Sequence, residues 1–380
     1  MIFNNNQNGG RVVVTTDGGA GSSGKGALNS YLADKYPFDL ATNNWMSNAG
    51  HYTELDDGTR ILVQHVPSAF IDPNIELYVN AGAGIDIEIL FNEIKRIEDL
   101  GFNIRDRLTI HPNANVITQE NKDYEKKTIK TGSTFKGCGA ALAAKSMRLP
   151  EQRLAKDYDE LAPFIKDRTQ ELNESVAKGM RVLIEGSQGM DLDINHSEYP
   201  YCTSRQTHPA QLVADAGLPC QAITNVIVNL RTNPIRISNV SAADGEHRYT
   251  GNYWDAAEIS WQTVAERAGF ASFDDFLALH RNAMMTSVTK KVRRIFEFPI
   301  ERIRFINTMA GGLLPNSHLL YSLNFANFID RTVRGAKTVE DVMTTKVREW
   351  LDNNLFKVIK PERLKWIRTG PRHSEIVEMN

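Results

Sequence analysis

The sequence of 380 residues lacks the features that mark several other classes of protein. It contains no apolar run near the roughly 18–20 residues needed to span a bilayer, so we expect no membrane segment. Its formal net charge of −2 gives no broad basic face, so we expect no nucleic-acid partner. The first residues, Met1 to Gln7, lack a charged region followed by an apolar core, so nothing suggests secretion.

Cysteine is also scarce, and the sequence contains neither an internal repeat nor a low-complexity linker. The three cysteines, Cys138, Cys202 and Cys220, are far apart and show no C-x-x-C spacing. A set of structural disulfides and a zinc site are therefore disfavoured. These properties predict a protein of the reducing cytoplasm.

The most informative segment that is present is Gly-Ala-Gly-Ser-Ser-Gly-Lys-Gly at residues 19–26. A β-branched run at 12–16 precedes it, and a helix-like segment at 27–33 follows. This order places backbone N–H groups and a helix N-terminus around an anion, and Lys25 adds a charge for outer phosphates. A structural turn is the alternative, and phosphate binding is favoured over it. Gly26 stands where the usual loop has the Ser or Thr that binds Mg²⁺, so this loop is a variant.

Short β-rich runs alternate with helix-like stretches along the chain. This alternation predicts an α/β fold with a mainly parallel central sheet and helices on both faces. We expect one domain over residues 1–380 with insertions, in which residues 118–131 and 286–296 are mobile or protruding elements. The expected strands are 11–16, 61–66, 108–111, 182–185, 222–229, 303–307, 319–323 and 364–369, and the expected helices are 87–100, 157–178, 255–268, 272–285 and 339–351.

Polar motifs that follow strands are informative because ligands collect at the carboxyl ends of parallel strands. Residues 48–51, Asn-Ala-Gly-His, place His51 in a small-residue turn, although a surface histidine is the simpler interpretation. Residues 131–139 put two hydroxyls and a lysine among glycines, which suits a second phosphate and equally suits a hinge.

Two more motifs leave alternatives open. In residues 185–189, Glu-Gly-Ser-Gln-Gly, the amide of Gln188 suits a base edge or a nucleophile, whereas Asp191 and Asp193 are expected to be solvated or to cap helices. Four cations in residues 290–294 form either a solvated loop or a clamp for a dicarboxylate.

The order and content of these blocks resemble the adenylosuccinate synthetase family over nearly the whole chain. The family has Gly-Asp-Glu-Gly-Lys-Gly where this chain has Gly-Ser-Ser-Gly-Lys-Gly at residues 21–26. Both have Asn-Ala-Gly-His, which stands at residues 48–51 of this chain. Its Gly-Thr-Thr-Gly-Arg-Gly is similar to residues 132–137, and its Glu-Gly-Ala-Gln-Gly to 185–189. Its Tyr-Pro-Tyr-Val-Thr-Ser is similar to residues 199–204, and its Ser-Thr-Gly-Pro to 368–371.

The resemblance implies a phosphate-loop NTPase-like fold with inserted subdomains and a two-step ligase reaction. The purine 6-oxygen takes the γ-phosphoryl group of a nucleoside triphosphate, and the amine of L-aspartate then displaces phosphate. Lys25 would hold the transferring phosphates, and His51 would stabilise charge or act as an acid. The implied catalytic residues are Ser22, Lys25, His51 and Gln188, and the implied Mg²⁺ ligands are Ser22 and Gly50.

The resemblance also implies which residues bind each substrate. Arg148 would reach the 5′-phosphate from a partner subunit, which implies a homodimer with a shared active site. Lys291 stands where the family has arginine, so a bidentate contact with aspartate is lost. The purine nucleotide would contact Ser22, Asn48, Ser133, Thr134, Arg148, Gln188 and Thr203. The phosphate donor would contact Ser23, Gly24, Lys25, Gly26, Gly50, His51, Tyr52, Arg293, Asn327, Thr369, Gly370 and Pro371. Aspartate would contact Ser287, Val288, Thr289, Lys291 and Arg293.

The chain departs from the family at Ser22, where the family has an aspartate that takes the N1 proton of hypoxanthine. A serine hydroxyl is no useful base near neutrality. Its shorter, neutral side chain clears space beside purine C2, where guanine has an amino group. This exchange is similar to a phage branch of the family that acts on dGMP on the way to 2,6-diaminopurine deoxynucleotides, and a phage enzyme would work in the host cytoplasm. Relay through water and a substrate carboxylate are the alternatives for removing the N1 proton.

A second departure concerns the phosphate donor. The family has Thr-Lys-Leu-Asp where this chain has Asn-Phe-Ala-Asn at residues 324–327. Asn327 offers both a donor and an acceptor, which suits the adenine edge, and Phe325 could stack on the base. We therefore expect ATP or dATP in place of GTP, with Mg²⁺.

Three other interpretations stay open. The chain could be an ordinary adenylosuccinate synthetase that acts on IMP with a relocated base. It could instead be a nucleotide-binding switch without activity, although such proteins usually lose the second-substrate site first, and here Arg148, Thr289, Lys291 and Arg293 persist. A phosphate-loop ligase of the biotin pathway fits less well, because the blocks around Gln188 and Thr203 do not match it.

Overall fold

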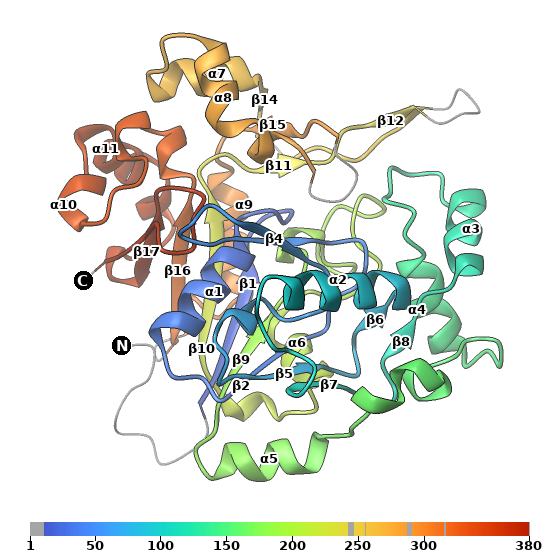
Figure 1. The fold of residues 1–380 in the computed structure, drawn as a ribbon. Coiled ribbons are helices and arrows are strands. Elements are labelled where there is room, and N and C mark those ends of the chain that lie inside the picture. The colour runs from blue at the N-terminus through green and yellow to red at the C-terminus, as the bar shows by residue number, and fades with distance from the viewer. Residues whose placement is uncertain (1–10, 242–246, 255, 287–290, 315–316, 380) are drawn as a thin grey trace.

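The central sheet has nine strands, of which eight run parallel (Figure 1). The structure is a computed structural model that describes residues 11–241, 247–254, 256–286, 291–314 and 317–379. All neighbouring pairs are parallel except the antiparallel pair at the C-terminal edge. In order across the sheet the strands are β18 (Ile376–Glu378), β17 (Leu364–Arg368), β16 (Leu319–Asn324), β10 (Ile223–Arg231), β1 (Arg11–Asp17), β9 (Arg181–Glu185), β2 (Leu40–Asn43), β5 (Glu76–Val79) and β7 (Leu108–Ile110).

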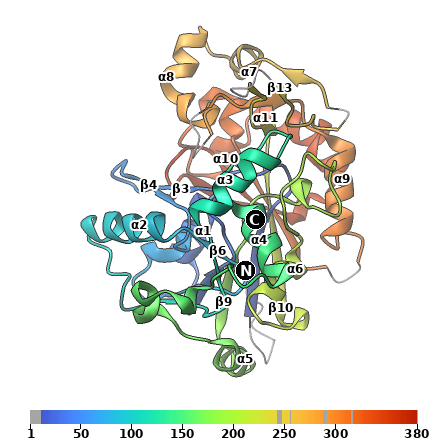
Figure 2. The ribbon, with the colours of Figure 1, turned by 90° about the vertical axis from the view of Figure 1, so that its right-hand side faces the viewer.

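Helices cover both faces of the sheet because alternate residues of its buried strands point to opposite sides. Val13 of β1 packs in a cluster with α1 and α2, whereas Val12 and Val14 pack in another with α5 and α6. On β10, Val228 and Leu230 join a third cluster with α9 and α11. Figure 2 shows these layers from the side. The helices are α1 (Lys25–Lys35), α2 (Ile87–Asp99), α3 (Gln119–Thr128), α4 (Cys138–Met147), α5 (Thr169–Ala177), α6 (Pro209–Asp215), α7 (Trp261–Ala268), α8 (Phe273–Met284), α9 (Ile300–Met309), α10 (Val339–Val342) and α11 (Thr345–Asn353).

Four small sheets lie around the main one. The group that holds α7 and α8 sits above the sheet in Figure 1 and has its own apolar cluster. These sheets are the pair β3 (His51–Glu54) with β4 (Arg60–Val63), the pair β6 (Gly84–Ile85) with β8 (Asn115–Val116), the pair β12 (Val240–Ser241) with β13 (His247–Arg248), and the three strands β11 (Ile235–Arg236), β15 (Arg294–Phe296) and β14 (Glu258–Ile259).

The fold class predicted from the sequence is confirmed, and several element predictions are wrong. Residues 303–307 lie in α9 and not in a strand, because Ile300, Ile303 and Ile306 repeat every three residues and share one face of a helix. Residues 61–66 contribute only the hairpin strand β4, and 157–178 contain a 3₁₀ turn with an internal proline before α5. The segment 118–131 forms the capped helix α3; its mobility stays a prediction.

Several elements were not predicted at all, and the bounds of two predicted helices differ from those observed. The sequence did not predict β2, β5, α3, α4 or α6, whose runs are short or polar. The expected helix at 255–268 begins only at Trp261, and residue 255 lies outside the described residues. The helix expected at 339–351 is divided into α10 and α11 by a second N-cap, Thr344.

The parallel strands all end at one edge, and this edge collects the polar motifs. The glycine-rich loop follows β1, the 48–51 turn follows β2, and residues 186–189 follow β9. Segments after β10, β16 and β17 complete the same edge. Among the described residues, no helix has the length and apolar character required to cross a bilayer.

Candidate functional site

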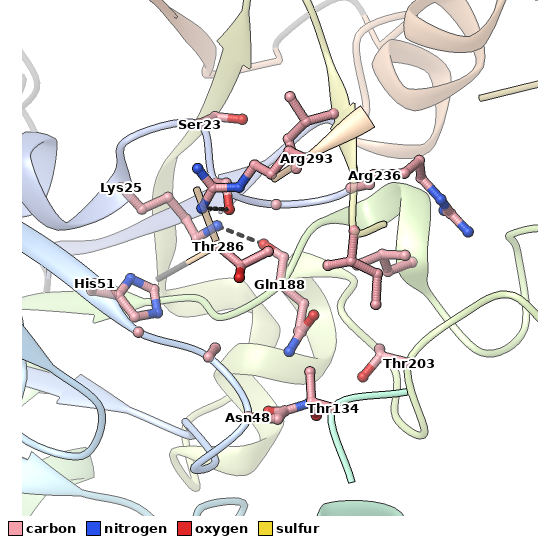
Figure 3. A pocket seen from close by; sticks show the side chains of 18 of the residues that line it. Ser23, Lys25, Asn48, His51, Thr134, Gln188, Thr203, Arg236, Thr286 and Arg293 are labelled. Carbon is pink, nitrogen blue, oxygen red and sulfur yellow. Dashed lines mark hydrogen bonds between the residues drawn. The ribbon is translucent and has the colours of Figure 1, made fainter. Parts of the chain in front are cut away.

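A cavity of about 730 Å³ opens at this edge of the sheet. Segments from nearly the whole length of the chain form its wall, and Figure 3 shows some of their side chains around a shared space. The predicted site residues on the wall are Ser22, Ser23, Gly24, Lys25, Gly26, Asn48, Gly50, His51, Tyr52, Ser133, Thr134, Gln188, Thr203, Arg293, Asn327, Gly370 and Pro371.

The glycine-rich loop forms a tight, left-handed path into α1. Gly21, Ser22 and Gly24 have φ angles of 85°, 59° and 84°. Serine pays a penalty of roughly 1–2 kcal/mol in this region, whereas glycine does not. Gly24 is the N-cap of α1 and has no side chain to cap the helix, so the first N–H groups of α1 are available to an anion in the cavity.

Close packing explains why residue 26 is glycine and not the Ser or Thr of the usual loop. A Cβ atom at this position would lie 2.6 Å from the carbonyl oxygen of Tyr52 and 3.1 Å from Cβ of His51. The strand β3 therefore packs directly on the first turn of α1. A Ser or Thr, as in the usual loop, cannot fit here without moving the segment that carries His51.

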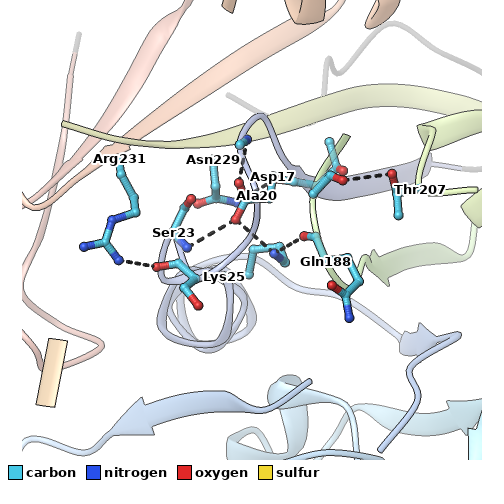
Figure 4. Close-up of polar contacts among 12 residues, drawn as sticks. Asp17, Ala20, Ser23, Lys25, Gln188, Thr207, Asn229 and Arg231 are labelled. Atoms are coloured by element: carbon cyan, nitrogen blue, oxygen red, sulfur yellow. Dashed lines mark hydrogen bonds and ion pairs between the residues drawn. The ribbon is translucent and has the colours of Figure 1, made fainter. Parts of the chain in front are cut away.

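Lys25 is buried at the centre of the loop. Its Nζ lies 3.1 Å from Oδ2 of Asp17 and donates a hydrogen bond of 2.6 Å to the carbonyl oxygen of Gln188 (Figure 4). The φ of Gln188 is 62°, so the backbone at this residue is left-handed and its side chain is free to line the cavity. The ammonium thus connects the phosphate loop to the segment that carries Gln188.

His51 is a buried, neutral ring at the edge of the cavity. It stacks on Trp45 with ring centroids 3.7 Å apart and an interplanar angle of 2°. Burial and the nearby charge of Lys25 hold the pKa of His51 well below its usual value of 6.5. Its Nε2 has no hydrogen-bond partner among the described residues, so this nitrogen is available to a bound ligand.

Ser22 lies between two buried arginines. Arg293 donates a hydrogen bond of 3.1 Å to its Oγ, and Arg231 donates one of 2.8 Å to its carbonyl oxygen. Burial lowers the pKa of Arg293 to about 10, which leaves the guanidinium charged at neutral pH.

The wall of the described part of the cavity has two carboxylates, and both are engaged. Glu54 forms an ion pair with Arg60, and Glu125 accepts hydrogen bonds from the backbone N–H groups of Gly137, Gly139 and Ala140 at the start of α4. Among the described residues there is no group of three His, Cys, Asp or Glu that could hold a metal ion. This donor set fits Mg²⁺ only as an ion bound mostly through phosphate oxygens.

Asn327 lines the cavity beside His280. Its Nδ2 is 3.3 Å from Nε2 of His280, and burial with the charge of Arg334 lowers the pKa of that histidine to about 3. Phe325 has a φ of 67°, and the Arg231 guanidinium covers its ring at 4.0 Å. Gly370 and Pro371 also line the cavity.

Part of the cavity wall carries hydroxyl and amide groups. Figure 3 shows Asn48, Thr134, Thr203 and Gln188 around the same space. Neutral donors of this kind, next to the start of α4, suit a phosphate group and a purine edge.

Some predicted residues do not line the cavity. Thr369 is fully buried and donates to the carbonyl oxygen of Ala336, so it shapes the loop behind the wall. Lys291 is exposed to solvent, and Arg148 is an exposed residue at the C-cap of α4. Ser287, Val288 and Thr289 lie outside the described residues.

The cations of residues 290–294 and the two acids Asp191 and Asp193 lie in environments that differ from those the sequence predicted. Arg293 is buried at the cavity and Arg294 pairs with Glu258, so only part of the charge run is solvated. Asp191 and Asp193 are buried, which makes their expected solvation wrong: Asp191 pairs with Arg302, and Asp193 accepts from the backbone N–H of Thr207.

Further wall residues were missed by sequence reasoning. Arg236 ends the short strand β11, which the sequence did not predict, and Arg368 ends β17, so only Arg368 had a usable signal in its position at a predicted strand end. The others belong to helices, a hairpin or loops and gave no such signal. The missed residues include Glu54, Arg60, Glu125, Arg236, Thr250, His280, Asn282 and Arg334, whereas Tyr201 and Arg368 lie in motifs that the sequence singled out without giving either residue a role.

Comparisons with known proteins agree with this arrangement. A sequence model described as adenylosuccinate synthetase matches residues 17–156 and 150–290. The N6-succino-2-amino-2′-deoxyadenylate synthase of Vibrio phage phiVC8 is 32% identical over 286 residues, which cover 73% of this chain and 76% of that protein. The adenylosuccinate synthetase of Thermococcus sibiricus is 29% identical over 374 residues, which cover 96% of this chain and 98% of that protein.

A solved structure extends the similarity to the whole fold. The succinoaminodeoxyadenylate synthetase of cyanophage S-2L, described as bound to dGMP and to dATP as an energy donor, has a TM-score of 0.74 to this chain. It is 26% identical, and the match covers 97% of this chain and 95% of that chain.

Proposed function

This chain belongs to the adenylosuccinate synthetase family, and we propose that it joins L-aspartate to the 6-position of dGMP. The reaction consumes ATP or dATP and yields 2-amino-2′-deoxy-N6-succino-AMP, the nucleoside diphosphate and phosphate. The chain is thus a ligase that forms a C–N bond, and its product leads to 2,6-diaminopurine nucleotides for DNA.

The observation that carries the choice of dGMP is Ser22. It stands in the phosphate loop at the place of the family's aspartate, it lines the cavity, and its hydroxyl contacts Arg293. A small neutral side chain there leaves room for the 2-amino group of guanine. The phage relatives support this choice, since one is named for this product and the other is described with dGMP bound.

The acceptor nucleotide occupies the part of the cavity whose wall carries hydroxyl and amide groups. Thr134 and Thr203 donate to its 5′-phosphate together with Ser133, and Asn48 and Gln188 face its purine. This placement is supported by the position of these side chains around one space.

In the first step the 6-oxygen of dGMP attacks the γ-phosphorus of the donor while the N1 proton leaves, either through water or to a carboxylate of the bound substrates, and the bond to the β,γ-bridging oxygen breaks. Lys25 faces the phosphates and stabilises the charge that develops on the transferring group. His51, being neutral, contributes a hydrogen bond from its ring and not an imidazolium charge. In the second step the amine of L-aspartate attacks C6, and phosphate leaves with the former 6-oxygen.

The donor nucleotide lies between the phosphate loop and Asn327. Ser23, Gly24 and Gly26 surround its phosphates with Gly50 and Tyr52, and Asn327 faces the adenine edge beside Gly370 and Pro371. Mg²⁺ bound through the phosphates and the Gly50 carbonyl would neutralise charge on the transferring group. The use of dATP by the cyanophage relative supports an adenine donor.

Aspartate and a second subunit complete the site in this proposal. Arg293 faces the cavity and receives an aspartate carboxylate. The family resemblance assigns Thr289 and Lys291, which lie shortly before it in the sequence, to the same substrate. Arg148 reaches the 5′-phosphate of a neighbouring subunit. Its exposure, among the exposed apolar side chains of Tyr124, Met147 and Leu149, supports a homodimer contact.

Phosphate release tests the proposed function. The protein is incubated with dGMP, L-aspartate, ATP and Mg²⁺, and the same mixture is run with IMP in place of dGMP. We expect turnover with dGMP and at least tenfold less with IMP. Turnover with IMP alone would return the chain to ordinary adenylosuccinate synthesis, and no turnover with either nucleotide would favour a switch without activity.

A further inference from the structure

Asp17 is a buried carboxylate beneath the phosphate loop that the mechanism above does not use. It is the last residue of β1 and is fully buried. Its Oδ1 accepts from the backbone N–H of Gly19 at 2.8 Å, and its Oδ2 accepts from that of Ser23 at 3.2 Å. The same Oδ2 lies 3.1 Å from Nζ of Lys25, as Figure 4 shows.

Lys25 needs a counter-ion, because an unpaired buried ammonium is costly. Only 4% of the lysine is exposed, and among the described residues its ion pair is with Asp17. Glu185, the buried acid that ends the neighbouring strand β9, accepts instead from Asn29 and from the backbone N–H groups of Ser68 and Ala69. The buried Asp191 and Asp193 are engaged with Arg302 and with the backbone N–H of Thr207.

The loop itself supplies no carboxylate. The family pattern has aspartate and glutamate where this chain has Ser22 and Ser23, so two acidic groups near the lysine are missing. Asp17 places one carboxylate behind the loop, on the strand. It does not line the cavity, so it cannot reach N1 of a purine and does not replace the family's base.

Lys25 also contacts the segment that carries Gln188, which we propose faces the purine of the acceptor nucleotide. Its second partner is the carbonyl oxygen of Gln188 at 2.6 Å, on a left-handed residue whose side chain lines the cavity. The ammonium of Lys25 therefore joins Asp17 at the end of β1 to the backbone of Gln188 after β9.

We propose that Asp17 is a positioning residue for Lys25: its carboxylate, itself oriented by the Gly19 and Ser23 amides, holds the ammonium in the place that receives the donor phosphates. This rests on the proposed function in one respect, namely that Lys25 contacts those phosphates. Because Asp17 acts through Lys25, its effect disappears when the lysine is gone.

A double-mutant cycle on ATP binding tests this without requiring turnover. Titration calorimetry with ATP and Mg²⁺ is run on the unmodified chain, Asp17→Asn, Lys25→Met and the double variant. We expect Asp17→Asn to weaken ATP binding 5- to 10-fold in the presence of Lys25 and less than 2-fold in its absence. Equal weakening in both backgrounds, or no weakening at all, overturns the proposal.

Two further variants serve as a control and as a replacement for Asp17→Asn. Asp39→Asn removes the carboxylate that pairs with Arg181 at the opposite end of the sheet, and should leave ATP binding unchanged. If Asp17→Asn does not fold, Asp17→Glu takes its place in the cycle, since it keeps the charge and displaces it by one methylene.

Turnover separates this proposal from the proposed function. With dGMP as substrate, Asp17→Asn should lower kcat at least tenfold while the KM for dGMP changes less than 3-fold. A chain that couples Asp17 to Lys25 in ATP binding but shows no ligase activity would refute the function and leave the positioning role intact.

Discussion

Ser22 is held by arginines on two sides, and this surrounding makes it a sensitive place for substitution. Arg293 contacts its hydroxyl, and Arg231 contacts its carbonyl group. Ser22→Asp would pair with Arg293 and put a base beside N1 of hypoxanthine, while crowding the 2-amino group of guanine. We expect the ratio of kcat/KM for IMP to that for dGMP to rise at least tenfold, measured by phosphate release. Ser22→Ala, which keeps the space, should retain the preference for dGMP; a preference unchanged in the aspartate variant would contradict the assignment.

Asn327 decides between donor nucleotides in our proposal. Its amide can donate to adenine N1 and accept from the 6-amino group, whereas a carboxylate can only accept. Asn327→Asp should therefore shift the kcat/KM ratio of ATP to GTP at least tenfold toward GTP, measured with dGMP and aspartate held constant. Asn327→Ala should weaken both donors alike, and an unchanged ATP/GTP ratio in the aspartate variant would sink the assignment.

At this scale the sequence predicted residues that belong to motifs and missed those that act through distant partners. Lys25, His51 and Gln188 lie in short patterns that follow strands, so their place at the cavity could be inferred. Asp17 and His280 could not be inferred, because their contacts with Lys25 and Asn327 exist only after folding. A contact between two buried side chains that are brought together only by folding leaves no pattern in the sequence.

The contact between α1 and β3 sets the shape of the phosphate loop, and Gly26 is its closest point. Gly26→Ser supplies the hydroxyl of the usual loop but pushes β3 and His51 outward, at a cost of about 1–3 kcal/mol typical of overpacking. We expect lower thermal stability and at least tenfold lower kcat. Gly26→Ala should match it on both counts, since the Cβ causes the clash. Higher activity in the serine variant would mean that the hydroxyl matters more than the contact.

Elements were predictable where an apolar period was long and unambiguous. The amphipathic pattern of α2 predicted residues 87–100, close to the observed Ile87–Asp99. The apolar residues of 303–307 fit a strand over five positions and a helix over ten, and the longer period prevailed in α9. The polar segment of α3 has almost no apolar face, so its helix depends on the capping box at Thr118, a weak signal to find without coordinates.

For the whole assembly, a shared active site predicts complementation. Arg148→Ala and Lys25→Ala each inactivate every site of a homodimer. In a mixed dimer, one site combines an intact Lys25 with the partner subunit's Arg148. We expect about a quarter of normal phosphate release after an equal mixture is unfolded and refolded together, since half of the dimers have one good site. Absence of recovery in verified mixed dimers would argue against a shared site.

The stability of the whole molecule should depend on pH through Glu93. This carboxylate on α2 accepts from the backbone N–H groups of Gln64, His65 and Val66, yet burial raises its pKa from 4.5 to about 7. The folded form therefore binds the proton more tightly, and its contribution is complete below pH 4.5 and lost as the pH rises through 7. The full loss is on the order of 3 kcal/mol.

Urea unfolding from pH 5 to 8 measures this effect. Glu93→Gln cannot ionise, so its free energy of unfolding should fall less steeply with pH than that of the unmodified chain. Glu98→Gln, at a partly exposed ion pair with Arg105, serves as the control and should keep the original slope. Identical slopes in the Glu93 variant and the unmodified chain would exclude Glu93 as the source.

The wall of the cavity begins at Ala20 and ends at Pro371. Its central strand β1 pairs with β9 and β10, which the ribosome makes much later. At 5–20 residues per second, roughly 345 residues separate Gly26 from Pro371, so the loop leaves the ribosome some 20–70 s before its site can close. A nascent chain that has not reached Pro371 therefore lacks part of the cavity wall, and a nucleotide that needs the whole wall cannot assist its folding before that point.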